Sequence, residues 1–70
     1  MGFKISMAAA RVNAKKTQLD IAKEMHLSKT TIVKWETGQV IPKPAQFAMY
    51  CQICGVPTDF VFLPNELTKS

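Results

Sequence analysis

The 70-residue sequence has few of the side chains that enzymes use for catalysis. It contains one histidine, and its five acidic residues are scattered along the chain. No serine, histidine and aspartate are grouped as a nucleophilic triad requires, and no glycine-rich loop is present to hold a phosphate. The sequence therefore predicts a protein that is not an enzyme and that uses no cofactor and no small-molecule substrate.

Cysteine is equally scarce, with two residues spaced as C-x-x-C at Cys51 and Cys54. A structural zinc site takes four ligands, and neither a second pair nor a cluster of histidines accompanies these two thiols. Residues three apart lie on one face of a helix, so we expect both side chains to pack inward as small apolar groups. A metal site, a redox role and a disulfide are the less favoured interpretations.

Long hydrophobic segments are also missing. A helix that spans a bilayer needs about 20 apolar residues, and no apolar run in the sequence approaches that length. The first residues also lack the apolar core of a secretory signal. A chain this short buries only about 60% of the surface that its unfolded form exposes, which leaves room for one small domain. We expect a single cytoplasmic domain over residues 1–70 without membrane contact, with an ordered core of about 4–64 and a flexible tail at 65–70.

Acidic residues are especially rare in the first part of the chain. Residues 1–43 carry eight basic and three acidic side chains, whereas residues 44–70 carry one basic and two acidic ones. The formal net charge is +4. This asymmetry favours an anionic partner such as nucleic acid on one face of the molecule, although a solvated basic surface is the simpler alternative.

Turn and capping residues divide the chain into short helices. The spacing of Ile5, Ala8, Ala9 and Val12 predicts a first helix over about 5–13, with these four residues on its buried face. Thr17 and Asp20 fit a capping box at the start of a second helix. Ser28 fits the N-cap of a third helix, which runs to about Thr37 and ends before Gly38.

The last third of the chain predicts two further helices. Pro44 suits the first turn of a fourth helix, which ends at Cys54 before Gly55. Thr58 is a candidate cap for a short fifth helix that holds Phe60 to Leu63 and ends at Pro64. This stretch is more apolar than one short helix can hide, so part of it is a candidate protein interface, including that of a homodimer.

The second and third helices have the layout of a helix-turn-helix. Ala22 is a small residue where the two helices cross, and Leu27 is an apolar plug in the turn. Ile32 and Trp35 are spaced to anchor the third helix in the core, which favours a packed indole over an exposed stacking platform. The opposite face is polar and presents Lys29, Thr30, Lys34 and Thr37.

The stretch from Thr17 to Gly38 resembles the Xre-type, lambda-repressor-like helix-turn-helix family. The shared pattern is quite specific over 22 residues and reads T-Q-x-x-[IL]-A-x-x-[LM]-x-[LV]-S-x-x-T-[IV]-x-x-[WIL]-E-x-G. The likeness continues in outline from Ile5 to Leu63. It implies a compact all-α domain of five helices, with the helix-turn-helix formed by the second and third.

The resemblance also implies roles for individual residues in binding duplex DNA. It places base contacts from Lys29, Thr30 and Lys34, with Val33 facing a thymine methyl group. The remaining positions are expected near phosphates, and the full set of implied DNA-binding residues is Gln18, Ser28, Lys29, Thr30, Val33, Lys34, Thr37, Gln39 and Lys43.

Four further positions bear on the resemblance. Arg11 and Glu36 match a pair that ties the first helix to the third in some members, the alternative being two independent solvated charges. His26 stands where the family usually has a left-handed glycine, so we interpret it as a turn residue rather than a ligand. Leu19 occupies a position that is normally polar, either as a harmless surface residue or as part of a protein contact.

Two functions follow from these patterns. The first is a transcriptional regulator of the Cro-like or prophage-repressor kind, which binds an operator through the helix around residues 29–37. The second is an antirepressor or antitoxin-like protein of the same fold, which binds a partner repressor or toxin. Leu19, Val33 and the apolar end at Phe60 to Leu63 are the features that favour the second function.

Overall fold

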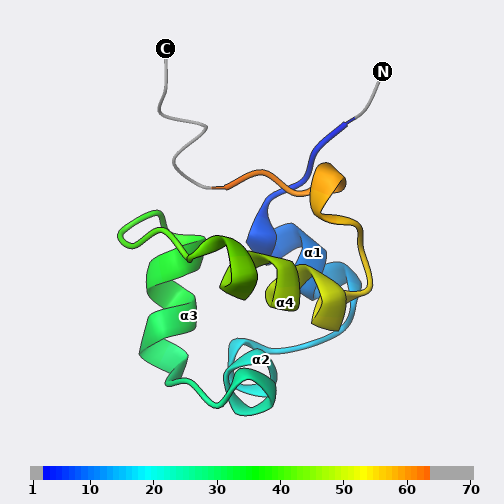
Figure 1. Cartoon of the computed structure of the whole chain (residues 1–70). Helices are drawn as coiled ribbons and strands as arrows, with labels where there is room; N and C mark the ends of the chain where they lie inside the picture. Colours follow the sequence, from blue (N-terminus) through cyan, green and yellow to red (C-terminus); the bar gives the residue numbers. More distant parts are fainter. Residues whose placement is uncertain (1–2, 64–70) are drawn as a thin grey trace.

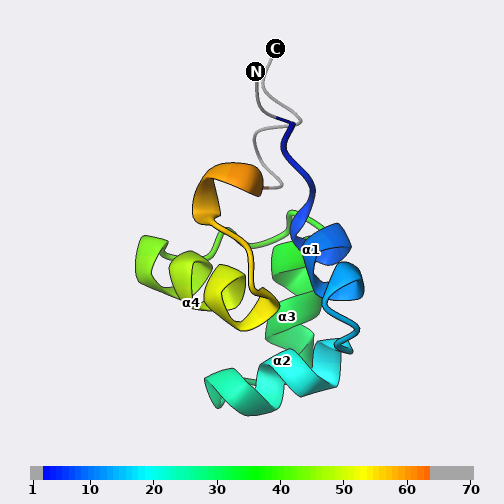
Figure 2. The ribbon, with the colours of Figure 1, turned by 90° about the vertical axis from the view of Figure 1, so that its right-hand side faces the viewer.

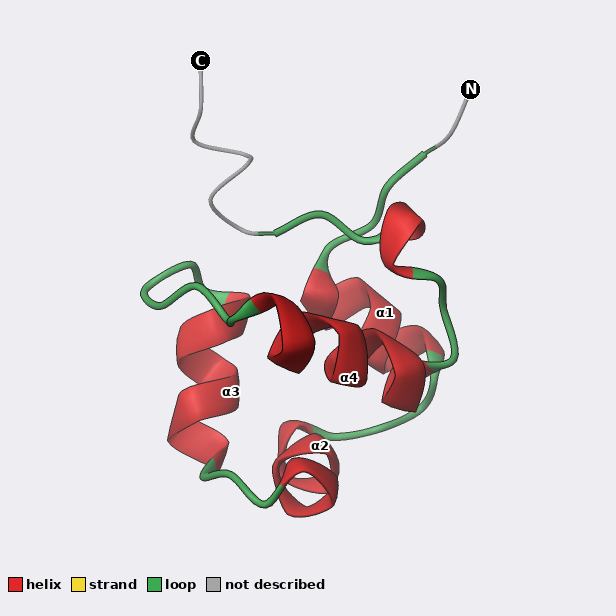
Figure 3. Cartoon of the chain, viewed as in Figure 1, coloured by secondary structure: helices red, strands yellow, loops and turns green. Residues whose placement is uncertain are grey.

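The computed structural model describes residues 3–63, in which four α-helices are followed by one 3₁₀ turn (Figure 1). Within this range every regular element is helical and no strand is formed, which agrees with the predicted all-α class (Figure 3). The predicted limit of the ordered core at residue 64 and the predicted tail at 65–70 lie outside the described residues. The elements are α1 (Met7–Asn13), α2 (Gln18–Met25), α3 (Lys29–Glu36), α4 (Pro44–Cys54) and η1 (Thr58–Phe60).

The predicted fifth helix is wrong. Only Thr58–Phe60 form a 3₁₀ turn, and Thr58 is its first residue rather than its cap. The chain then becomes extended, and Val61 forms a parallel β-bridge with Ile5. Two backbone hydrogen bonds fix this bridge, from Ile5 N to Phe60 O at 2.8 Å and from Phe62 N to Ile5 O at 3.0 Å. The run of aromatic and β-branched residues favours this extended conformation.

Side-chain caps define where the first three helices begin. The Ser6 hydroxyl accepts a hydrogen bond from Ala9 N at 3.0 Å, and Ser28 accepts one from Thr31 N at 3.2 Å. Thr17 and Asp20 form the predicted capping box, with Thr17 N to Asp20 Oδ2 at 2.8 Å and Asp20 N to Thr17 Oγ1 at 3.0 Å. The predicted caps at Thr17 and Ser28 are therefore confirmed, and α4 starts at Pro44 as expected.

The core is a single cluster that draws on every helix. Its buried members are Met7, Ala10, Ile21, Ala22, Ile32, Trp35, Tyr50, Cys51, Cys54 and Val61.

The buried face of α1 differs from the predicted one. Met7 and Ala10 are the fully buried residues, and Val12 is 60% exposed. The reason is that the helix begins after Ser6, so Ile5 belongs to the extended segment and does not set the helical register. Ile5 still packs against the core from outside the helix.

The helices are arranged so that α3 stands at one side of the molecule (Figure 1). In the view of Figure 2, α4 and α1 appear on either side of α3 and α2 lies below it, and the turn between α2 and α3 is short. The two ends of the described chain meet at the Ile5–Val61 bridge, on the side away from α2 (Figure 1). In the described part of the chain, each helix is too short or too polar to cross a membrane.

Candidate nucleic-acid interface

The junction between α2 and α3 is the tight turn that a helix-turn-helix needs. His26 ends α2 in the left-handed region at φ 59° and ψ 41°, as the sequence predicts. Leu27 packs against the core cluster and Ser28 caps α3. The buried Ala22 on α2 completes the junction. Three residues, His26, Leu27 and Ser28, therefore connect α2 to α3 in a tight turn.

The two faces of α3 differ in the way the sequence predicts. Ile32 is fully buried and Trp35 is 2% exposed, so the helix is anchored by its apolar side and the indole belongs to the core. On the opposite side Lys29, Thr30 and Lys34 are exposed. Val33 is half-buried at the edge of this surface. An eight-residue helix thus presents a polar, positively charged face from a rigid base.

The residues that follow α3 extend this exposed surface. Thr37, Gln39 and Lys43 are all exposed. The Thr37 hydroxyl donates to Val33 O at 2.9 Å, and Gln39 Nε2 donates to Thr37 Oγ1 at 3.0 Å. These bonds hold Thr37 and Gln39 against the last turn of α3, whereas Lys43 lies at the other end of the loop, directly before α4.

Two more of the predicted contact residues, Ser28 and Gln18, also have hydrogen-bond partners inside the protein. The Ser28 hydroxyl caps α3 and also lies 3.0 Å from Thr31 Oγ1. Gln18 is half-buried, and its side-chain amide donates to Glu36 Oε1 at 3.1 Å. The structure thus gives Gln18 a role that the sequence analysis did not assign, because its amide joins the start of α2 to the end of α3.

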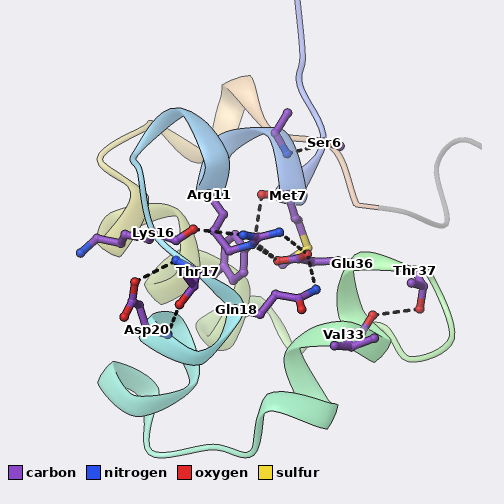
Figure 4. Close-up of polar contacts among 12 residues, drawn as sticks. Ser6, Met7, Arg11, Lys16, Thr17, Gln18, Asp20, Val33, Glu36 and Thr37 are labelled. Atoms are coloured by element: carbon purple, nitrogen blue, oxygen red, sulfur yellow. Dashed lines mark hydrogen bonds and ion pairs between the residues drawn. The ribbon is translucent and has the colours of Figure 1, made fainter.

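The predicted pairing of Arg11 with Glu36 is confirmed (Figure 4). Arg11 Nε lies 2.7 Å from Glu36 Oε2, and Arg11 Nη2 lies 3.1 Å from Glu36 Oε1, which makes the contact bidentate. Arg11 Nη1 also donates to Lys16 O at 3.0 Å. The pair therefore joins α1 to α3 and braces the link that leads into α2.

Tyr50 is the member of this network that the sequence analysis missed. Its hydroxyl oxygen lies 2.5 Å from Glu36 Oε2 and 2.9 Å from Met7 O. The sequence analysis assigned Tyr50 no hydrogen-bonding role. The phenol group could have predicted this role, because a buried hydroxyl needs a hydrogen-bond partner.

The network determines the charge state of its members. Burial opposes ionisation of Glu36, whose side chain is 4% exposed, but hydrogen bonds from Arg11, Tyr50 and Gln18 outweigh it and lower the pKa of the carboxyl group. The hydrogen bond with Glu36 is the main reason that the pKa of Arg11 is raised. Burial and the nearby carboxylate raise the pKa of Tyr50 far above its usual value. The carboxylate is therefore charged and the phenol neutral at physiological pH.

The two cysteines contribute to packing, as predicted. Cys51 and Cys54 are free thiols buried on α4. Burial raises the pKa of both, that of Cys54 to about 11, which keeps them protonated and poorly nucleophilic. Among the described residues, no three histidine, cysteine or acidic side chains are grouped so that they could hold a metal ion.

Several large apolar side chains are exposed outside the polar face of α3. Leu19 on α2 is 47% exposed and Phe60 in η1 is 52% exposed. The sequence analysis singled out both as candidate contact residues. Val40 and Ile41, in the loop after α3, are also exposed at 44% and 41%. The sequence analysis did not single them out, although their apolar β-branched side chains in a loop were visible in the sequence.

Comparison with known proteins agrees with this geometry. A family model described as helix-turn-helix matches residues 7–61, which covers α1 through η1. The searches of curated proteins and of solved structures found no significant match.

Proposed function

This chain belongs to the Xre-type helix-turn-helix family, and from that premise we propose that it is a sequence-specific regulator of transcription that binds duplex DNA. In this proposal it is a Cro-like or prophage-repressor type of protein, and its partner is an operator. The observation that carries the proposal is the two-sided nature of α3. Its apolar side is anchored by Ile32 and Trp35, while its opposite side carries exposed lysines.

The major groove of B-DNA admits an α-helix, and α3 has the polarity to enter it. Lys29 and Thr30 stand at the first turn of α3, where side chains of a recognition helix reach base edges. Lys34 follows more than one turn later, and Val33 between them offers a methyl group to thymine. A lysine that donates to guanine O6 or N7 gives about 1–3 kcal/mol of base discrimination.

Phosphate contacts come from the two ends of the motif. Gln18 and Ser28 lie at the N-terminal ends of α2 and α3, where backbone N–H groups and the helix dipole favour an anion. Thr37, Gln39 and Lys43 flank the C-terminal end of α3. Because Gln18 is held by Glu36, the same carboxylate that fixes α3 also fixes this phosphate contact.

The decisive experiment measures DNA binding by variants of α3. A preferred duplex is first selected from a random pool, and affinities are measured by fluorescence anisotropy. Lys29→Ala and Lys34→Ala are each expected to weaken binding about 10-fold or more, and Lys29→Ala is expected to relax base preference as well. Affinity is expected to fall steeply as salt rises, because phosphate contacts release counterions.

Lys23→Ala is the matched control, since Lys23 is also an exposed lysine but belongs to α2. It is expected to change affinity little. If the three alanine variants bind equally well, or if no duplex is bound at about 50 mM salt, α3 is not a recognition helix and the proposal is wrong.

A second function is favoured by one specific observation, the 47% exposure of Leu19 at a position that is usually polar in this family. In this alternative the chain is an antirepressor or antitoxin-like protein that binds a partner repressor or toxin. A pull-down with a candidate partner repressor tests this alternative. Capture that is lost in Leu19→Ser and kept in Lys29→Ala, together with no duplex binding, would establish this function instead of the first.

A further inference from the structure

The contacts of Tyr50 on α4 go beyond what packing of an aromatic ring requires. The side chain is fully buried, and its single hydroxyl proton is within reach of two acceptors, Glu36 Oε2 at 2.5 Å and Met7 O at 2.9 Å. The carboxylate is charged and makes the shorter contact, so it is the stronger acceptor of the two. Through this contact α4 fixes the position of one oxygen of Glu36.

The other oxygen of the Glu36 carboxylate orients the side chain of Gln18. Gln18 Nε2 donates to Glu36 Oε1 at 3.1 Å (Figure 4). An ionised carboxylate only accepts hydrogen bonds, so the amide must turn its NH₂ group toward Glu36 and its oxygen away. Within residues 3–63 this is the one hydrogen bond that the Gln18 side chain makes. Its second N–H is therefore left for a ligand at the N-terminal end of α2.

The three side chains that donate to Glu36 differ in stiffness. Arg11 and Gln18 are long and flexible, whereas Tyr50 has a rigid ring with two side-chain torsions and is held in the core. A carboxylate is one planar group, so a fixed position of Oε2 also fixes Oε1. Loss of the phenol contact therefore displaces both oxygens and, with them, the amide of Gln18.

We propose that Tyr50 is a positioning residue for DNA binding, which acts through Glu36 on the phosphate contact of Gln18. The inference rests on the proposed function, since Gln18 meets a phosphate only if the chain binds duplex DNA. Tyr50 itself is 0% exposed and does not touch the duplex. A hydroxyl group in the core thus contributes to the affinity of a contact that is made at the surface of α2.

The test is a double-mutant cycle of Tyr50→Phe and Gln18→Ala. Affinities for the selected duplex are measured by fluorescence anisotropy and corrected for the folded fraction of each variant. Each single variant is expected to bind about 5-fold more weakly than the wild-type chain, the effect of one hydrogen bond. Because Tyr50 acts through Gln18, the double variant is expected to lose about 5-fold as well. A loss of about 25-fold would mean independent roles and would overturn the proposal.

Duplexes with one phosphate at a time replaced by a neutral methylphosphonate show which contact is affected. At the phosphate that Gln18 meets, the wild-type chain is expected to lose about 5-fold in affinity, whereas Tyr50→Phe and Gln18→Ala lose little. Base preference is expected to stay unchanged in Tyr50→Phe, because the proposed base contacts belong to α3. A general loosening of the domain would instead alter the response at many phosphates, and that outcome would contradict the proposal.

Cys51→Ala is the matched control, because it also removes one buried heavy atom from α4 but none of the donors to Glu36. It is expected to lower stability and to leave the affinity of the folded chain unchanged. In the free protein, the NMR order parameter of the Gln18 side-chain amide is expected to fall in Tyr50→Phe and not in Cys51→Ala.

The outcomes separate this inference from the proposed function. If the wild-type chain binds duplex DNA, and Lys29→Ala weakens binding but Tyr50→Phe does not, the inference on Tyr50 is wrong and the proposed function stands. Equal losses of affinity in Tyr50→Phe and Cys51→Ala would also overturn it, since Tyr50 would then act through stability alone. A wild-type chain that binds no duplex would overturn both.

Discussion

Glu36 joins four helices through one carboxylate. It belongs to α3 and accepts hydrogen bonds from Arg11 of α1, Gln18 of α2 and Tyr50 of α4. Four donors reach its two oxygens, which satisfies the acceptor capacity of a carboxylate. A buried charge is tolerated only when it is paired and hydrogen-bonded in this way. The residue therefore sets the orientation of α3 relative to the rest of the molecule.

We expect Glu36→Ala to lower the free energy of unfolding by about 3–5 kcal/mol, because it leaves the largely buried Arg11 guanidinium without its counter-ion. Glu24→Ala is the matched control, since Glu24 forms an exposed ion pair with Lys16 at 3.1 Å. Loss of that pair is expected to cost about 1 kcal/mol or less. Urea denaturation of both variants provides the comparison, and equal losses would contradict the structural role of Glu36.

The lowered pKa of Glu36 also predicts how stability depends on pH. A carboxyl group with a folded pKa below its ordinary value of 4.5 stabilises the protein above that value, and the contribution is lost as pH falls through the folded pKa. Asp20, whose pKa is lowered by its hydrogen bonds with Thr17, acts in the same direction.

Thermal unfolding from about pH 6 to about pH 3 should therefore show a marked loss of stability in the wild-type chain. Glu36→Gln keeps the shape of the side chain but removes its titration. It is expected to be less stable at neutral pH and to lose less on acidification. A variant whose pH profile runs parallel to that of the wild type would mean that Glu36 does not contribute to the acid sensitivity.

At the scale of the helices, the four α-helices within residues 3–63 end in the same way. In each case the left-handed residue donates its N–H three positions back, and the next residue donates its N–H five positions back. These paired bonds define a Schellman motif and satisfy carbonyls that the helix leaves open. The left-handed residues are Lys15, His26, Gly38 and Gly55.

This shared geometry predicts opposite effects of two substitutions. His26→Gly is expected to raise the free energy of unfolding by about 1 kcal/mol, because a side chain is disfavoured in the left-handed region. Gly55→Ala is expected to lower it by a similar amount. At Gly55 nothing lies within 4 Å of the added Cβ, so the loss arises from its φ of +76° and not from a clash.

Both changes can be measured by thermal or urea denaturation. If His26→Gly is destabilising instead, the imidazole must make a compensating contact in the turn. In that case the turn would depend on histidine for more than its backbone conformation.

Local sequence signals located most helix ends because capping is a short-range interaction. Thr17, Ser28, Pro44 and the residues before Gly38 and Gly55 mark boundaries that the structure reproduces within one residue. The failures occur where a distant segment competes. The first helix starts at Met7 and not at Ile5, and the fifth helix is one turn, because Ile5 and Val61 pair across the molecule.

In the whole molecule, one small core supports two different surfaces. One surface is the polar face of α3, and the other is an apolar groove beside α4, whose lining includes Pro42, Phe47 and Leu63. They are linked by the loop that follows α3. The proposed DNA-binding surface and this groove are therefore adjacent parts of the same fold.

The sequence by itself determined the helix-turn-helix. Its caps, its apolar spacing at Ile32 and Trp35 and its exposed lysines are all set within 22 residues, because they depend on helical periodicity and on contacts three or four residues apart. Its resemblance to other members further indicated the Arg11–Glu36 pair. Only the tertiary structure decided that Gln18 and Tyr50 complete the environment of Glu36, and that the segments around Ile5 and Val61 pair. Those contacts span 14 to 56 residues along the chain, and no local pattern specifies which distant partners will meet.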